Sequence, residues 1–146
     1  MFRTIILLNI LFCSLKIMAA EHTIDLSQST QVLKQKEQGM FIIEVKIKPQ
    51  TQLNEEAPIK VELEKSNVFQ FTKTMLGKED IQKKEKSSFQ FQIPFQALAT
   101  GKHEIKGEIR FYMCSPSACN LVNEKLVWIV DGRFNSEMQQ YLRNGI

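Results

Sequence analysis

Residues 104–113 read EIKGEIRFYM, a stretch in which Ile105, Ile109, Phe111 and Met113 alternate with charged or polar residues. Alternation with a period of two indicates a β-strand that buries one face and exposes the other. Three more stretches follow this pattern: FIIEVKIK at residues 41–48, IKVELE at residues 59–64 and SFQFQIPF at residues 88–95. The chain is therefore predicted to be all-β, because no stretch has the 3.6-residue period of a long helix.

The remaining strand signals are shorter. Residues 68–71 contain two phenylalanines, and residues 121–130 carry Leu126, Trp128 and Val130 on one face. With the turns between them, these segments predict an immunoglobulin-like antiparallel β-sandwich of about six to eight strands. Most of the ten phenylalanines fall at inward positions, so we expect them to form the core. Pro94 is expected at a sheet edge or at a strand end, because proline donates no ladder hydrogen bond.

The first 20 residues have the pattern of an export signal peptide. Arg3 provides a positive charge, residues 4–15 are mostly apolar, and residues 18–20 (Met-Ala-Ala) offer a cleavage site. The apolar run is shorter than the roughly 20 residues that a membrane span needs. We expect cleavage after Ala19 or Ala20 and no membrane insertion afterwards; an uncleaved N-terminal anchor is the alternative. The mature chain is expected in the periplasm, with secretion as the alternative.

Loss of the signal peptide changes both the charge and the cysteine count. Arg3 and Lys16 leave with it, so Lys+Arg falls from 19 to 17 against 16 Asp+Glu, and the net charge falls from +3 to +1. A nearly neutral chain has no electrostatic reason to bind nucleic acid or anionic lipid. Cys13 also leaves, so the three cysteines become the pair Cys114 and Cys119 in an oxidising compartment.

The mature chain is short enough to form one domain. Residues 21–38 are expected to be a polar lead-in, loosely held or adding an edge strand, and residues 39–131 to form the β-sandwich. Residues 132–146 are expected to be a tail or a short helix, for which Asn135 or Ser136 would be the N-cap.

Cys114 and Cys119 flank a four-residue connection, Ser-Pro-Ser-Ala, between two expected strands. Ser-Pro favours a turn, which would bring the two ends close enough for a disulfide. A bridge across so short a loop contributes only roughly 2 kcal/mol in the chain-entropy model. Small closed loops at exposed turns also carry the more exchangeable disulfides. From the residues alone, a structural staple and a redox pair remain open as equal alternatives.

A strand with an aromatic end, then Cys-x4-Cys, then another strand late in the sandwich resembles the disulfide-bond-corrector-like domains. That family includes the N-terminal periplasmic domain of the thiol:disulfide interchange protein DsbD. The resemblance covers roughly residues 40–130. It implies that Cys114 and Cys119 are the redox pair and that a cap loop with a bulky side chain shields them. Met75 and Leu76 fall in the corresponding place, so they are the cap-loop candidates.

The resemblance implies thiol–disulfide exchange, in which a thiolate attacks a disulfide through a mixed-disulfide intermediate. Cys119 is the candidate partner-linked thiol, Cys114 the resolving thiol, and the expected partner is another envelope thiol or disulfide protein. The sequence departs from the family at residues 120–122, where Asn-Leu-Val replaces a proline-containing stretch. It also departs at residues 49–53, which carry no aromatic residue. The alternative function is a non-enzymatic envelope binding or assembly module with a structural disulfide.

No cofactor or metal is expected. Structural zinc needs four ligands, whereas the mature chain has one cysteine pair. His103 is expected in a solvated turn and His22 in a disordered N-terminus. Met113 could add a soft ligand for Cu(I), but an inward methionine is explained more simply as core. The chain has no Gly-x-Ser-x-Gly, His-Glu-x-x-His or phosphate-loop motif, so nothing supports a hydrolase or a nucleotide enzyme.

Overall fold

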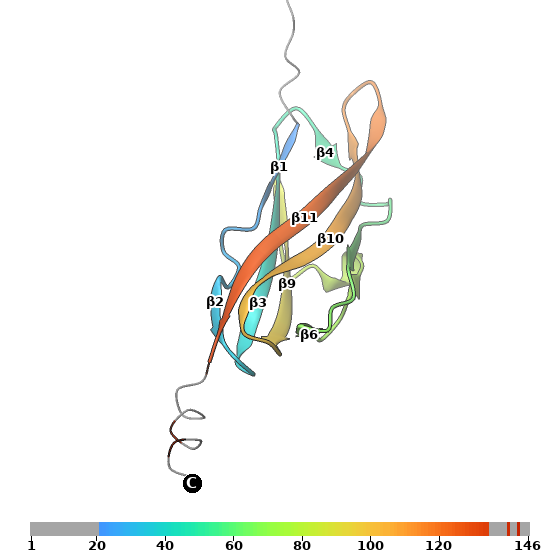
Figure 1. The fold of residues 1–146 in the computed structure, drawn as a ribbon. Coiled ribbons are helices and arrows are strands. Elements are labelled where there is room, and N and C mark those ends of the chain that lie inside the picture. Colours follow the sequence, from blue (N-terminus) through green and yellow to red (C-terminus); the bar gives the residue numbers. More distant parts are fainter. Residues whose placement is uncertain (1–20, 135–139, 141–142, 144–146) are drawn as a thin grey trace, which may run out of the picture.

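A computed structural model describes residues 21–134, together with Gln140 and Arg143. Two β-sheets pack face to face as a β-sandwich, which confirms the expected fold class (Figure 1). The first sheet has the order β1-β3-β9-β6 with β8 also paired to β9: β1 (His22–Asp25), β3 (Gln38–Ile47), β9 (Ser88–Ala97), β6 (Phe69–Phe71) and β8 (Lys83–Glu85). The second has the order β2-β11-β10-β5-β7 with β4 also paired to β10: β2 (Val32–Lys34), β11 (Cys119–Arg133), β10 (Gly101–Cys114), β5 (Lys60–Leu63), β7 (Met75–Leu76) and β4 (Gln52–Leu53).

The core lies between the two inner faces and is built mainly from phenylalanine. Phe89 packs edge-on against Phe91, with ring centroids 6.0 Å apart, and against Phe111 of the other sheet at 5.6 Å. Such edge-to-face contacts add to the gain from burial. The five largest buried side chains are all phenylalanines that the alternation placed inward: Phe41, Phe89, Phe91, Phe95 and Phe111.

The described chain contains 11 strands, more than the six to eight expected. The additional strands are two to four residues long, too short for an alternation to show. Two of them, β1 and β2, lie in the lead-in at residues 21–38. β1 pairs with β3 over four residues, and β2 pairs with the end of β11. The lead-in is therefore part of both sheets. The β2–β11 pair is parallel, an exception to the expected antiparallel sandwich.

Pro94 lies within β9 rather than at its end. β8 pairs with β9 only as far as Gln90, and β6 pairs only from Phe95 onward, so β9 has no strand partner on that side at Pro94. Its carbonyl accepts a hydrogen bond from Thr72 N at 3.3 Å. The missing proline N–H faces this gap, so the strand continues without the loss of a ladder bond.

A long hairpin formed by β10 and β11 dominates the second sheet (Figure 1). Fourteen residue pairs join the two strands without a bulge, from Gly101↔Gly132 to Cys114↔Cys119. The turn that enters β10 ends at Gly101, whose φ of 94° lies in the left-handed region that favours glycine. β11 runs to Arg133, two residues past the expected boundary. The tail helix expected around Asn135 lies outside the described residues.

Candidate functional site

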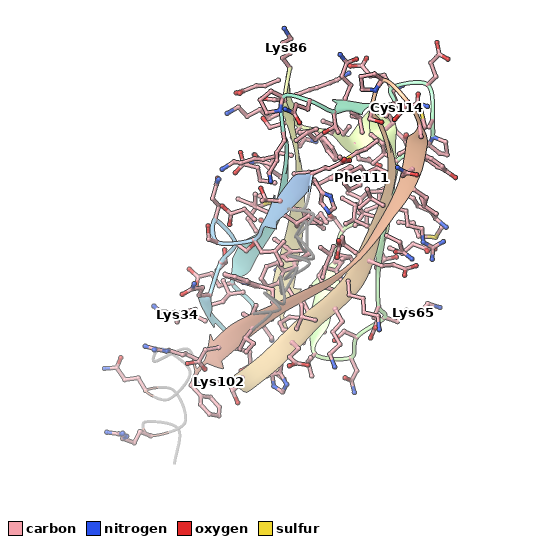
Figure 2. The ribbon with its side chains drawn as sticks, turned by 90° about the horizontal axis from the view of Figure 1, so that it is seen from above. Lys34, Lys65, Lys86, Lys102, Phe111 and Cys114 are labelled. Atoms are coloured by element: carbon pink, nitrogen blue, oxygen red, sulfur yellow. A yellow bond between two sulfur atoms is a disulfide. The ribbon has the colours of Figure 1, made fainter. Side chains whose placement is uncertain are left out.

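Cys114 and Cys119 form a disulfide at the free end of the β10–β11 hairpin. Figure 2 shows Cys114 at the opposite end of the hairpin from Lys102. The loop between the cysteines is closed by Ser115 N, which donates to Ala118 O at 2.8 Å. The Ser115 hydroxyl makes a second bond to the same carbonyl at 3.2 Å. The sequence therefore predicted a turn here correctly.

The strand ladder, rather than the bridge alone, holds the two cysteines together. Their Cα atoms are 3.9 Å apart, near the roughly 4.5 Å of a non-hydrogen-bonded antiparallel pair. The bond from Ser115 N to Ala118 O, one residue beyond the pair on each strand, identifies it as such a pair. The hydrogen-bonded pairing of β10 with β11 fixes the strand register independently of the bridge, so the two thiols would remain opposite each other after reduction.

The disulfide projects from the outer face of the second sheet, away from the core. Along β10, the buried side chains of Phe111 and Met113 point inward, so Cys114, the residue after Met113, points outward. Along β11, Leu126 and Val130 are buried, whereas odd-numbered residues such as Leu121, 53% exposed, point to solvent.

The two cysteines differ in their surroundings. Cys114 is half-buried, and β4 lies beside it, with Gln52 directly opposite. Cys119 is exposed, and β11 has no strand on its other side at this point among the described residues. An approaching thiol therefore has freer access to the sulfur of Cys119 than to that of Cys114.

The nearest pair on the same face consists of Tyr112 and Leu121, which are directly opposite each other. Arg110 and Lys125 lie further along. Arg110 forms ion pairs with Glu62 and Glu108, and Lys125 is directly opposite Glu108 in the strand register.

Glu62 is held ionised by its basic neighbours. The hydrogen bond from Lys60 lowers the pKa of Glu62, and the charges of Lys60 and Arg110 lower it further. Glu62 and Glu108 thus pair with Arg110, which lies four residues before Cys114 along β10.

The cap-loop candidates lie on a different part of the sheet from the cysteines. Met75 is paired with Glu62, which is paired in turn with Glu108, six residues before Cys114. At about 3.3 Å per residue this is roughly 20 Å along β10. Leu76 is buried in the core, and Met75 is exposed. The register does not bring either residue to the disulfide, so the cap role stays a prediction without a contact behind it.

The segment that does flank Cys114 is β4, a two-residue strand that no alternation in the sequence predicts. Leu53 is opposite Met113 and packs partly against the core, while Gln52 is opposite Cys114. Asn54 N donates to Tyr112 O at 2.9 Å and continues this pairing. The one available signal was Leu53, a large apolar side chain in an otherwise polar run.

Both histidines lie within strands, and the contacts they make are with groups other than the cysteines. His22 belongs to β1; its ring packs edge-on against Phe111 and bonds to Glu124 at 3.2 Å, so the expectation of a disordered N-terminus is wrong there. His103 is near the start of β10, bonded to Thr100 O at 2.8 Å. Within the described residues, no group of three or more His, Cys, Asp and Glu side chains is placed to hold a metal ion.

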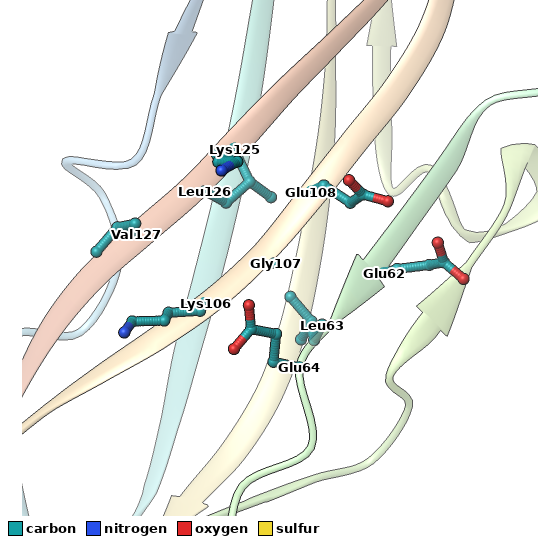
Figure 3. Close-up of a pocket in the computed structure, with 9 residues that line it drawn as sticks. All are labelled: Glu62, Leu63, Glu64, Lys106, Gly107, Glu108, Lys125, Leu126 and Val127. Carbon is teal, nitrogen blue, oxygen red and sulfur yellow. The ribbon is translucent and has the colours of Figure 1, made fainter.

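Among the hollows in the described part of the chain, two are considered with the hairpin. A groove of about 450 Å³ runs over Gly107 on the second sheet, between rows that carry Lys106, Lys125, Glu64 and Glu108 (Figure 3). A larger hollow of about 580 Å³ lies at the sandwich end beyond β4, lined by residues that include Gln52 and Leu53. The second hollow is therefore separated from the disulfide by β4.

No protein-family model matches this chain, and no curated protein matches it. Among solved structures it is similar to alpha-2-macroglobulin of E. coli, at 15% identity over 79% of this chain and a TM-score of 0.46. It is also similar to the N-terminal periplasmic domain of ScsB from Proteus mirabilis, at 12% identity over 79% of this chain and a TM-score of 0.44. The chain spans 7% of the first protein and 50% of the second. These likenesses are too distant to assign a family. In the part of the chain that the structure describes, no helix has the length and apolarity to cross a membrane.

Proposed function

We propose that this chain is an exported thiol–disulfide exchange protein whose Cys114–Cys119 pair reacts with another protein of the periplasm. The observation that carries the proposal is the exposure of Cys119 at the outer face of a hairpin tip. A disulfide that serves exchange must present a sulfur to a second protein, and small, exposed bridges are the labile kind.

The reaction proceeds through two exchanges. A thiolate of the partner bonds to the sulfur of Cys119, the Cys114–Cys119 bond breaks, and the electron pair leaves with the Cys114 sulfur, which takes up a proton. A second thiol of the partner then attacks the partner's own sulfur in the mixed disulfide and releases Cys119. The partner dithiol is oxidised to a disulfide, and Cys114 and Cys119 become thiols. The reverse sequence reduces a partner disulfide.

The alternative role as a staple receives less support from the fold. A bridge that closes a six-residue loop contributes roughly 2 kcal/mol through chain entropy. Here the strands behind it are already joined by a ladder of fourteen pairs. The bridge connects neighbouring strands of one sheet and does not tie the two sheets together across the core.

The reduction potential of the pair tests this function. We expect a reduction potential well above about −300 mV. Disulfides with a potential below that value are structural and resist reduction by the glutathione pool. We also expect the Cys114→Ser variant, which keeps the exposed Cys119, to form a mixed disulfide with oxidised glutathione faster than Cys119→Ser does. A potential below that limit would assign the bridge to the staple role, in a binding or assembly module.

A further inference from the structure

One edge of β11 has no neighbouring strand over most of its length. β2 pairs only with Asp131–Arg133, and among the described residues no strand pairs with this side of β11 from Cys119 to Val130. Because Cys114 and Cys119 are a non-hydrogen-bonded pair of the hairpin, the backbone N–H and C=O of Cys119 point to this outer edge.

The alternation of an antiparallel ladder directs the backbone groups of every second residue to the same edge. Two bonds at the far end show the same direction: Asp131 N donates to Gln31 O, and Arg133 O accepts from Gln35 N, both at 2.8 Å. The outward groups with no hydrogen-bond partner in the described chain therefore belong to Cys119, Leu121, Asn123, Lys125, Val127 and Ile129.

We propose that this edge binds an extended, cysteine-bearing segment of the partner protein as an added antiparallel strand, with the partner's cysteine opposite Cys119. The proposal rests on the proposed thiol–disulfide function. A regular row of donors and acceptors is satisfied by another extended backbone, which defines the chemistry of the occupant. Leu121 and Val127, each at least half exposed, offer apolar contacts to alternate side chains of that strand.

The geometry of such a strand suits the exchange reaction. A residue that forms a hydrogen-bonded pair with Cys119 has its Cα about 5.5 Å away and its side chain on the same sheet face. That separation lies in the roughly 4.4–6.8 Å range that a disulfide requires. The mixed disulfide can therefore form without displacing β11.

The three sulfurs would also lie in a row across neighbouring strands: the partner's, then Cys119, then Cys114. A thiolate attacks a disulfide sulfur along the line of the bond that breaks, so the attack from the added strand falls on Cys119. The new bond joins the partner sulfur to Cys119, and the electron pair leaves on Cys114. On the opposite side, β4 holds Gln52 beside Cys114 and occupies the corresponding approach.

The test compares three thiols as reductants of the wild-type disulfide. The first is a nine-residue peptide of alternating valine and threonine with its cysteine at position 8, so that its residues 1–7 lie opposite residues 126–120 of β11. The second is the same peptide with N-methyl groups on its strand-pairing amides. Glutathione, which cannot add as a strand, is the third. We expect the plain peptide to react at least about tenfold faster than the methylated one, since several backbone hydrogen bonds are gained on binding. Equal rates for the two peptides would overturn the docking proposal, while reduction by glutathione would leave the proposed function standing. If none of the three thiols reduces the bridge, both proposals fail.

A matched pair of variants locates the effect on the edge. Asn123→Pro removes an outward N–H, whereas Asn123→Ala keeps it. We expect the advantage of the plain peptide to be lost in the proline variant and kept in the alanine variant, with glutathione rates unchanged in both. An advantage that survives in a folded proline variant would contradict strand addition.

Amide hydrogen exchange gives a readout that does not depend on a proline variant. In the mixed disulfide of the plain peptide with the Cys114→Ser protein, we expect slower exchange at Leu121, Asn123 and Lys125 than in the free protein. Unchanged exchange at these three amides would overturn the proposal. So would a wild-type dimer that buries them in sedimentation and exchange experiments, because the edge would then belong to a second copy.

Discussion

The two ends of β11 are built in opposite ways. Near Arg133 the outward backbone groups bond to residues in β2 and beside it. Gly132 also packs so closely on the turn before β10 that an added Cβ would lie 2.4 Å from Ala99 O. Near Cys119 the same strand has a free outward edge in the described chain, and Cys119 itself is exposed. One continuous ladder to β10 joins the closed end to the open end.

This difference separates stability from reactivity along one strand. Substitutions at the closed end act on packed backbone and should reduce the free energy of unfolding. Substitutions at the open end meet solvent on two sides and should leave the fold in place while they change how the protein reacts or associates. The register of the closed end is nevertheless what holds the two cysteines opposite each other.

The largest expected effect is at the closed end. Gly132→Val would push a branched side chain into the backbone of the Ala99 turn, so we expect a loss of about 3 kcal/mol in the free energy of unfolding. Urea denaturation followed by circular dichroism measures it. Asn123→Val, at an exposed position of the same strand, is the control and should stay within about 0.5 kcal/mol of wild type. Similar losses in both variants would remove the distinction between the ends.

Removal of the disulfide should have a smaller effect on the fold. We expect the Cys114→Ser/Cys119→Ser protein to lose at most about 2 kcal/mol, because the bridge closes only a short loop behind an intact ladder. The urea midpoints of the oxidised, reduced and double-serine proteins check this. Unfolding upon reduction alone would show that the hairpin depends on its bridge, which the proposed redox cycle does not allow.

A pair of prolines at adjacent positions sharpens the comparison between the two edges of β11. Glu124 lies in a hydrogen-bonded pair with Ile109, as the alternation requires, whereas the N–H of Asn123 points to the open edge. Glu124→Pro should therefore be less stable than Asn123→Pro by at least about 1 kcal/mol, because it leaves the carbonyl of Ile109 in β10 without its hydrogen-bond donor. Equal stability of the two folded variants, measured in urea, would contradict the assigned direction of the backbone groups.

The sequence predicted the parts of this molecule whose signal is local. The alternation at Phe41 and Phe111, among others, assigned the inner faces correctly, and the Ser-Pro connection predicted the turn between Cys114 and Cys119. Pro94 was expected at a sheet edge or at a strand end, and the first alternative is the correct one. The strand β9 continues through Pro94, and the position is a local edge because two short neighbouring strands leave a gap there.

The features that depend on long-range pairing could not be derived in this way. Gln52 flanks Cys114 across 62 residues of sequence, and a two-residue strand shows no period. The placement of Met75 opposite Glu62 followed from the register of β5 and β7, which no local pattern specifies. The open edge of β11 is likewise a property of strand order, because alternation shows which face is buried and not which neighbour is present.

The smallest effect on stability is expected at Lys125, in the middle of the open edge. It is the charged residue among those with free outward backbone groups, and charged side chains on edge strands discourage edge-to-edge pairing. Lys125→Val would leave only apolar or neutral residues at the outward-facing positions of β11 from Leu121 to Ile129. The free energy of unfolding should change by no more than about 0.5 kcal/mol while self-association increases. Sedimentation velocity over a concentration series measures this, with Lys102→Val, at the closed end of the hairpin, as the control. If both variants associate no more than the wild type, the edge of β11 does not accept an added strand readily. The open and closed ends of β11 would then differ in reactivity only through the exposure of Cys119.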